Sequence, residues 1–178
     1  MGDLKTLDRQ ALEKIGGALV PHLNCMGTAS AVFVLEGIKG AKVRTMDTAA
    51  FIAHGVRLRS YRFDKYHTKT PADEKPTLVS FAVALDHPEA ADKPFADLDR
   101  LADGIFFTRD LVTEPPNVIY PETLAAKCRD LKKLGVDVQV LEEAAMKKLG
   151  MNALLGVVQG SIRESQLAGM RWNGLGKS

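Results

Sequence analysis

The sequence predicts an α/β fold with a mostly parallel sheet and flanking helices, built as two partial α/β units joined by a long helix and a Pro-Pro turn. Three observations predict it. Helix and strand patterns alternate along the chain, as they do in parallel sheets. The runs 29–35 and 77–85 are apolar at almost every position, which is typical of strands covered on both faces. Pro115 and Pro116 must end any helix that reaches them.

The composition is that of a globular protein with a core, since 46% of the 178 residues are hydrophobic and the formal net charge is only +2. No apolar run approaches the roughly 20 residues that span a bilayer, and the N-terminal sequence shows no secretory signal. Cys25 and Cys128 form no Cys-x-x-Cys pair, which fits a reducing compartment. We therefore expect a soluble, cytoplasmic chain without membrane contact.

The first part of the chain predicts a helix followed by a strand. Apolar residues recur at helical spacing over residues 7–19, and Thr6 is a suitable N-cap. Pro21 should close this helix, because proline lacks the backbone N–H that the next turn needs. The run 29–35 then predicts a strand covered on both faces.

A second helix is expected to run to about residue 63, and its apolar arc also contains Arg59 and Arg62. This conflict is resolved if the long arginine stems cover apolar surface. Their charged ends would then reach water or a carboxylate such as Asp64.

The run 77–85 has the strongest strand pattern and is expected to lie at the centre of the sheet. The long helix that follows it should stop at about Thr113, because Pro115 and Pro116 cannot continue it. Pro121 can open the next helix, since its fixed φ suits the first helical turn.

After this turn the sequence predicts a helix with a buried face that extends to Leu134. Alternating valines predict a half-buried strand over 136–141. A short helix over 142–149 and further strands over 153–158 and 167–172 complete the pattern.

No catalytic or metal-binding pattern is visible in the sequence. It contains neither His-Glu-x-x-His nor Gly-x-Ser-x-Gly, and its four histidines are scattered. We interpret each histidine as structural or solvated, and a two-histidine metal site stays open as the alternative.

One basic and aromatic run, residues 57–69, could contact phosphate groups through Arg57, Arg59, Arg62 and Lys65. The alternative is a helix end whose cations compensate the helix dipole and pack against their neighbours. The near-neutral charge of the whole chain favours this second interpretation.

Four blocks of sequence resemble the leucyl (cytosol) aminopeptidase family. They are 60–66 (SYRFDKY), 109–117 (RDLVTEPPN), 148–151 (KLGM) and 158–161 (VQGS), and the resemblance runs in order across nearly the whole chain. It implies a hexameric protease of the hydrolase class. In this family an N-terminal α/β domain is joined by a long helix to a catalytic domain. That catalytic domain holds two divalent metal ions, Mn or Zn, and releases N-terminal residues from peptides.

The resemblance also implies a division of this chain. Residues 1–88 would form part of the N-terminal domain, 89–114 the connecting helix, and 115–178 the truncated start of the catalytic domain. The block around the turn would be a structural joint formed by Asp110, Glu114, Pro115, Pro116 and Asn117.

The family's metal-binding and catalytic motifs would lie beyond Trp172, so the resemblance carries no catalytic and no metal-binding residue onto this chain. We therefore expect the chain to hold no metal cofactor and to be inactive alone, although peptides are the substrates of the family. The alternatives are an assembly or DNA-binding module of the same family, in which the run 57–69 would contact DNA, and a self-contained α/β enzyme of another kind. A homo-oligomer is expected in either family case, and DNA is the weaker expectation.

Overall fold

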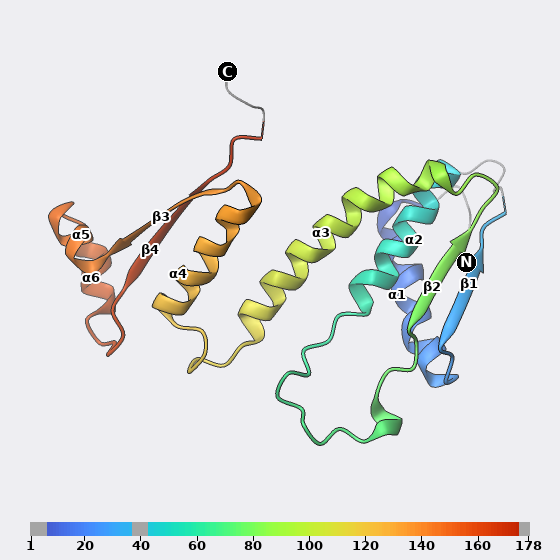
Figure 1. The fold of residues 1–178 in the computed structure, drawn as a ribbon, viewed down its shortest axis with the longest axis horizontal. Helices are drawn as coiled ribbons and strands as arrows, with labels where there is room; N and C mark the ends of the chain where they lie inside the picture. The colour runs from blue at the N-terminus through green and yellow to red at the C-terminus, as the bar shows by residue number, and fades with distance from the viewer. Residues whose placement is uncertain (1–6, 37–42, 175–178) are drawn as a thin grey trace. The chain divides into compact units, whose positions relative to one another are not determined.

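The computed structural model describes residues 7–36 and 43–174, so Thr6, the expected first N-cap, lies outside the described residues. The chain divides into two compact units, Met1–Asp110 and Leu111–Ser178 (Figure 1). Within the described residues each unit combines helices with a two-stranded sheet, which confirms the α/β class.

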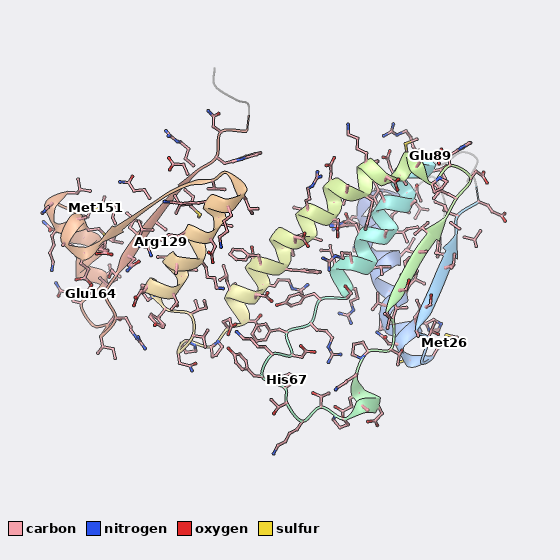
Figure 2. The ribbon with its side chains drawn as sticks, in the orientation of Figure 1. Met26, His67, Glu89, Arg129, Met151 and Glu164 are labelled. Atoms are coloured by element: carbon pink, nitrogen blue, oxygen red, sulfur yellow. The ribbon has the colours of Figure 1, made fainter. Side chains whose placement is uncertain are left out.

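The first helix, α1 (Arg9–Cys25), begins at Asp8, whose carboxylate accepts a hydrogen bond from the Ala11 N–H at 2.8 Å. Pro21 lies inside α1, so the prediction that it ends the helix is wrong. Proline removes one helical hydrogen bond, but the helix continues to Cys25, and the N–H of its C-cap Met26 donates to the His22 carbonyl at 3.2 Å. Figure 2 labels Met26 just beyond the end of α1.

The sheet of the first unit pairs β1 (Ser30–Val34) with β2 (Ser80–Ala84) in parallel, as expected for an α/β chain. Helices α1 and α2 (Thr45–Arg59) lie on the same side of this sheet (Figure 1). The core forms between them, where Phe33 and Phe81 of the sheet pack against a cluster of Leu7, Leu12 and Ile52.

The opposite face of the β1–β2 sheet is exposed in the described part of the chain, contrary to the expectation of strands covered on both faces. Val32 and Val34 are 63% and 65% exposed. The expected central position of 77–85 is also wrong, since β2 pairs with β1 alone in the described part of the chain. An apolar run favours a buried strand, but it does not specify which element covers each face.

Helices α1 and α2 are in backbone contact at two glycines. A Cβ atom at Gly16 would overlap the Ile52 carbonyl oxygen, and one at Gly55 would overlap the Glu13 carbonyl oxygen. Only glycine permits this close approach of two helices. The α2 helix ends at Arg59, four residues earlier than expected, with Ser60 as its C-cap.

The loop between α2 and β2 contains the 3₁₀ turn η2 (Ala72–Glu74), and Figure 2 labels His67 in this loop. The same figure labels Glu89 at the start of the long helix α3. The α3 helix (Glu89–Thr113) buries Leu98 and Ala102. It ends at Thr113, directly before the Pro-Pro turn, as the sequence predicts.

In the second unit, α4 (Pro121–Asp130) begins at Pro121 as predicted. Its sheet is antiparallel, with Asp137 opposite Arg171, and α4 packs against it (Figure 1). The remaining elements are η3 (Leu131–Leu134), β3 (Asp137–Glu142), α5 (Glu143–Lys148), α6 (Asn152–Val158) and β4 (Gln166–Arg171).

Two expectations for this unit are wrong. Residues 153–158 form most of helix α6 rather than a strand, because a short apolar run has no periodicity that separates the two. Leu134 is 74% exposed, and the buried residue of α4 is Ala125.

Candidate functional site

The four basic residues singled out in the run 57–69 lie in different surroundings. Arg57, on α2, is held by α3: its Nε lies 2.9 Å from Asp99 Oδ1 and its terminal nitrogen lies 2.9 Å from Asp103 Oδ1. Its guanidinium also lies over the Phe106 ring, 4.6 Å from the centroid. Arg57 therefore fastens α2 to α3, and its donors are engaged by protein carboxylates.

Arg62 and Lys65 lie beyond the end of α2, in the segment that leads to β2. The Arg62 Nε is 3.7 Å from Asp64 Oδ2, which is the carboxylate that the sequence suggested for it. The Lys65 Nζ lies 5.4 Å from the centre of the Tyr66 ring. Arg59 is exposed at the end of α2, and within residues 7–36 and 43–174 its side chain makes no ion pair or hydrogen bond.

The end of α1, the segment 59–62 and the chain before β2 enclose a hollow of about 320 Å³. Arg59 and Arg62 are its charged lining residues, and its lining contains no acidic residue. Its other lining residues are Val20, Pro21, Asn24, Ser60, Tyr61, Pro76 and Leu78. A hollow with two cations and apolar walls can hold an anion, and the sequence pattern alone did not separate these two arginines from Arg57.

Asp110, a residue of the predicted joint, is tied to the segment after α2. The Tyr61 hydroxyl donates to Asp110 Oδ1 at 2.7 Å. The Tyr61 ring lies 4.1 Å from the Arg109 guanidinium carbon and 5.1 Å from the Phe106 ring centre. Sequence spacing does not reveal this contact, because 49 residues separate the two partners.

The rest of the joint forms a turn. The Pro115 carbonyl accepts hydrogen bonds from the N–H groups of Val118 and Ile119, at 2.9 and 3.0 Å. The Tyr120 N–H then donates to Thr123 Oγ1 at 3.0 Å, which caps α4. The structural role expected for Glu114, Pro116 and Asn117 in this joint stays a prediction.

The α1–α2 interface contains a buried histidine. His54 is 2% exposed, and its Nδ1 lies 3.0 Å from Glu13 Oε1. Burial raises the pKa of Glu13, but hydrogen bonds from Arg9 and His54 and the charges of both outweigh it, so the pKa is lowered from its ordinary value of 4.5. His54 is thus one of the structural histidines that the sequence interpretation anticipated.

The described residues do not fit a two-metal centre. Within residues 7–36 and 43–174, no group of three or more His, Cys, Asp or Glu side chains is placed to hold a metal ion. Two-metal hydrolysis needs several such ligands around ions that lie about 3.5–4 Å apart. In the same part of the chain, no helix has the length and apolar character needed to cross a bilayer.

Comparison with known proteins gives two family matches, one in the first part of the chain and one that begins within the last turns of the long helix. Residues 1–70 match the model for the N-terminal domain of the cytosol aminopeptidase family, and residues 106–178 match the model for its catalytic domain.

Individual relatives support both matches. A probable cytosol aminopeptidase of Bradyrhizobium sp. is 47% identical over 161 residues, which are 90% of this chain and 32% of that protein. One of Caulobacter vibrioides is 50% identical over 128 residues, 72% of this chain and 26% of that protein. The chain therefore spans about a third, or less, of the length of these relatives.

Solved structures show a similar fold. The bottromycin maturation enzyme BotP in complex with Mn aligns with a TM-score of 0.79 at 22% identity, over 97% of this chain and 35% of that one. A mutant tomato leucine aminopeptidase aligns with a TM-score of 0.76 at 19% identity, over 90% of this chain and 32% of that one.

Proposed function

Because the chain belongs to the cytosol aminopeptidase family, we propose that it supplies part of the α/β framework of a metal-dependent aminopeptidase that releases N-terminal residues from peptides. The observation that carries this proposal is the order of the two family matches, N-terminal domain before α3 and catalytic domain from the end of α3 onward. The domain boundaries at 88 and 114 are part of the proposal.

The catalysis proposed for the whole enzyme uses two divalent ions, Mn or Zn, and the relation to a structure described as a complex with Mn supports the metal. Such ions polarise the scissile carbonyl and activate a water molecule. The donors of the described residues do not fit that centre. We therefore propose a framework role for this chain and no hydrolysis by the chain alone.

A chimera tests the framework role. The matching 161-residue stretch of the Bradyrhizobium relative would be replaced by the corresponding part of this chain. We expect the chimera to retain Mn²⁺-dependent hydrolysis of leucine p-nitroanilide within about tenfold of the relative, a loss of about 1.4 kcal/mol in transition-state stabilisation. A chimera that does not fold, or that folds without activity, would contradict the proposal.

A cytoplasmic location and homo-oligomeric assembly belong to the same proposal, and the relatives' description as cytosol aminopeptidases supports the location. Light scattering on the purified chain tests the assembly, and a monomer at all concentrations would count against it. DNA binding stays a prediction, and the pairing of Arg57 with Asp99 and Asp103 removes one of the four cations proposed for it.

A further inference from the structure

We propose that the hollow lined by Asn24, Arg59 and Arg62 binds an oxyanion, phosphate or carboxylate, carried on an apolar or aromatic body. This inference does not depend on the aminopeptidase function. It rests on the charge of the hollow, on the donor groups that its walls present, and on its size.

The charged side chains that line the hollow are both cations, Arg59 and Arg62. No acidic residue lines it, and Arg59 has no carboxylate partner in the described part of the chain. Asp64 forms an ion pair with Arg62, but its Oδ2 lies 3.7 Å from the Arg62 Nε, which is longer than a hydrogen bond, so the Arg62 N–H groups can still donate to a ligand. Arg57, two residues before Arg59 on α2, differs from both, since two close carboxylates bind its guanidinium.

Two backbone carbonyls near the end of α2 already accept hydrogen bonds from Ser60. The carbonyls of Val56 and Arg57 accept hydrogen bonds from the Ser60 N–H at 3.0 and 3.2 Å. The Ser60 hydroxyl also donates to the Arg57 carbonyl, at 2.7 Å. No hydrogen bond of the described residues engages the guanidinium groups of Arg59 and Arg62, so an incoming anion can accept from both.

Asn24 supplies a third donor in a fixed orientation. Its Oδ1 accepts from the N–H groups of Thr77 and Leu78, each at 2.9 Å, which identifies the oxygen and locks the amide plane. The Nδ2 group is then a donor, and it makes no hydrogen bond within the described residues. A donor held in place before binding loses less side-chain entropy when the ligand arrives.

The apolar walls and the volume of the hollow indicate which group carries the oxyanion in the proposed ligand. Val20, Pro21, Pro76 and Leu78 form an apolar lining beside the cations. A volume of about 320 Å³ lies at the small end of ordinary ligand pockets, about 300–1,000 Å³. An aryl or alkyl group that carries one oxyanion fits both properties, whereas a bare inorganic ion would leave the apolar walls uncovered.

The inference is tested by titrating the purified chain with inorganic phosphate, phenyl phosphate and benzoate. Binding is measured by calorimetry and by the NMR signals of the Asn24 side-chain amide. We expect saturable binding of phenyl phosphate or benzoate, tighter than that of inorganic phosphate, with a shift of the Asn24 amide signals. The better of the two organic probes identifies the oxyanion as phosphate or carboxylate.

Arg59→Gln and Arg62→Gln should each weaken this binding at least about tenfold, that is, by about 1.4 kcal/mol. Arg100→Gln is the matched control, because Arg100 is an exposed arginine of α3 outside this hollow, and it should bind like the parent chain. Equal affinity of all three variants would overturn the inference. The inference would also be overturned if none of the small anions saturated the chain at concentrations up to about 10 mM, which corresponds to a binding free energy weaker than about 2.7 kcal/mol. Binding of an oligonucleotide would not rescue it in that case.

Discussion

Gly55 of α2 lies directly against the Glu13 carbonyl of α1, in a space where no side-chain carbon fits. Gly16 of α1 makes the reciprocal contact with the Ile52 carbonyl of α2. The two helices are thus in backbone contact beside the core cluster of Leu7, Leu12 and Ile52. The packing of the first unit depends on these two glycines.

Gly55→Ala should therefore destabilise the chain, because the added methyl group forces α1 and α2 apart. Overpacking of this kind costs about 1–3 kcal/mol in the free energy of unfolding, measured by urea denaturation. The control is Gly104→Ala in α3, where a Cβ meets nothing within 4 Å. That change should stabilise by about 0.5–1 kcal/mol, since alanine favours the helix. A Gly55→Ala chain as stable as the parent would refute the close contact.

Glu13→Gln tests the buried pair with His54. The pKa of Glu13 is lower in the folded chain than its ordinary value, despite the opposing effect of burial, because Arg9 and His54 donate to the carboxylate. Its ionised form therefore stabilises the fold above the unfolded pKa, and this contribution is lost as the pH falls through the folded pKa.

At pH 7 we expect Glu13→Gln to lower the free energy of unfolding by about 1.5–3 kcal/mol, the worth of hydrogen bonds to a charged group. The difference from the parent should shrink as the pH falls below the ordinary value of 4.5. Glu74→Gln, in the exposed turn η2, should change stability by less than about 0.5 kcal/mol. A Glu13 effect that does not vary with pH would show that the charge is not its source.

Arg57→Gln should loosen the attachment of α2 to α3. Partly exposed ion pairs contribute about 0.2–1 kcal/mol each, and the contact with the Phe106 ring adds about 0.5–1 kcal/mol. A double-mutant cycle with Asp99→Asn should give a positive coupling energy that decreases when salt is added. A coupling energy of zero at low salt would mean that the ion pair of Arg57 and Asp99, with its N–O distance of 2.9 Å, does not stabilise the fold.

Tyr61→Phe should weaken the hold of α3 on the segment after α2, because it removes the 2.7 Å hydrogen bond to Asp110 and keeps the ring. The expected loss is about 0.5–1.5 kcal/mol. Hydrogen exchange of the last turns of α3 measures it locally. If Asp110→Ala abolishes the effect of Tyr61→Phe, the bond is confirmed; additive effects of the two changes would exclude it.

The sequence was sufficient where a local physical rule decides the structure. Helix α3 ends at Thr113, just before Pro115 and Pro116, where two successive prolines remove two helical N–H donors. Pro121 opens α4, where its fixed φ suits the first turn. The alternation of valines correctly predicted β3, since a strand with one covered face imposes a period of two.

The sequence failed where no local rule decides the structure. Residues 153–158 form most of helix α6, although a short apolar run fits a strand and a helix alike, and Pro21 lies within α1, although proline disfavours a helix interior. The candidate site shows the same limit. Arg57, Arg59 and Arg62 look alike in the sequence, and only the position of Asp99 and Asp103 on α3 separates the first from the other two.

The most direct test of a framework role without a metal centre is a peptidase assay on the purified 178-residue chain. Leucine p-nitroanilide would be offered with added Mn²⁺ or Zn²⁺, alongside an intact cytosol aminopeptidase as positive control. The account predicts no release of p-nitroaniline above the buffer rate with either ion. Metal-dependent turnover that follows the chain through purification, and that is lost when the ion is chelated, would contradict it.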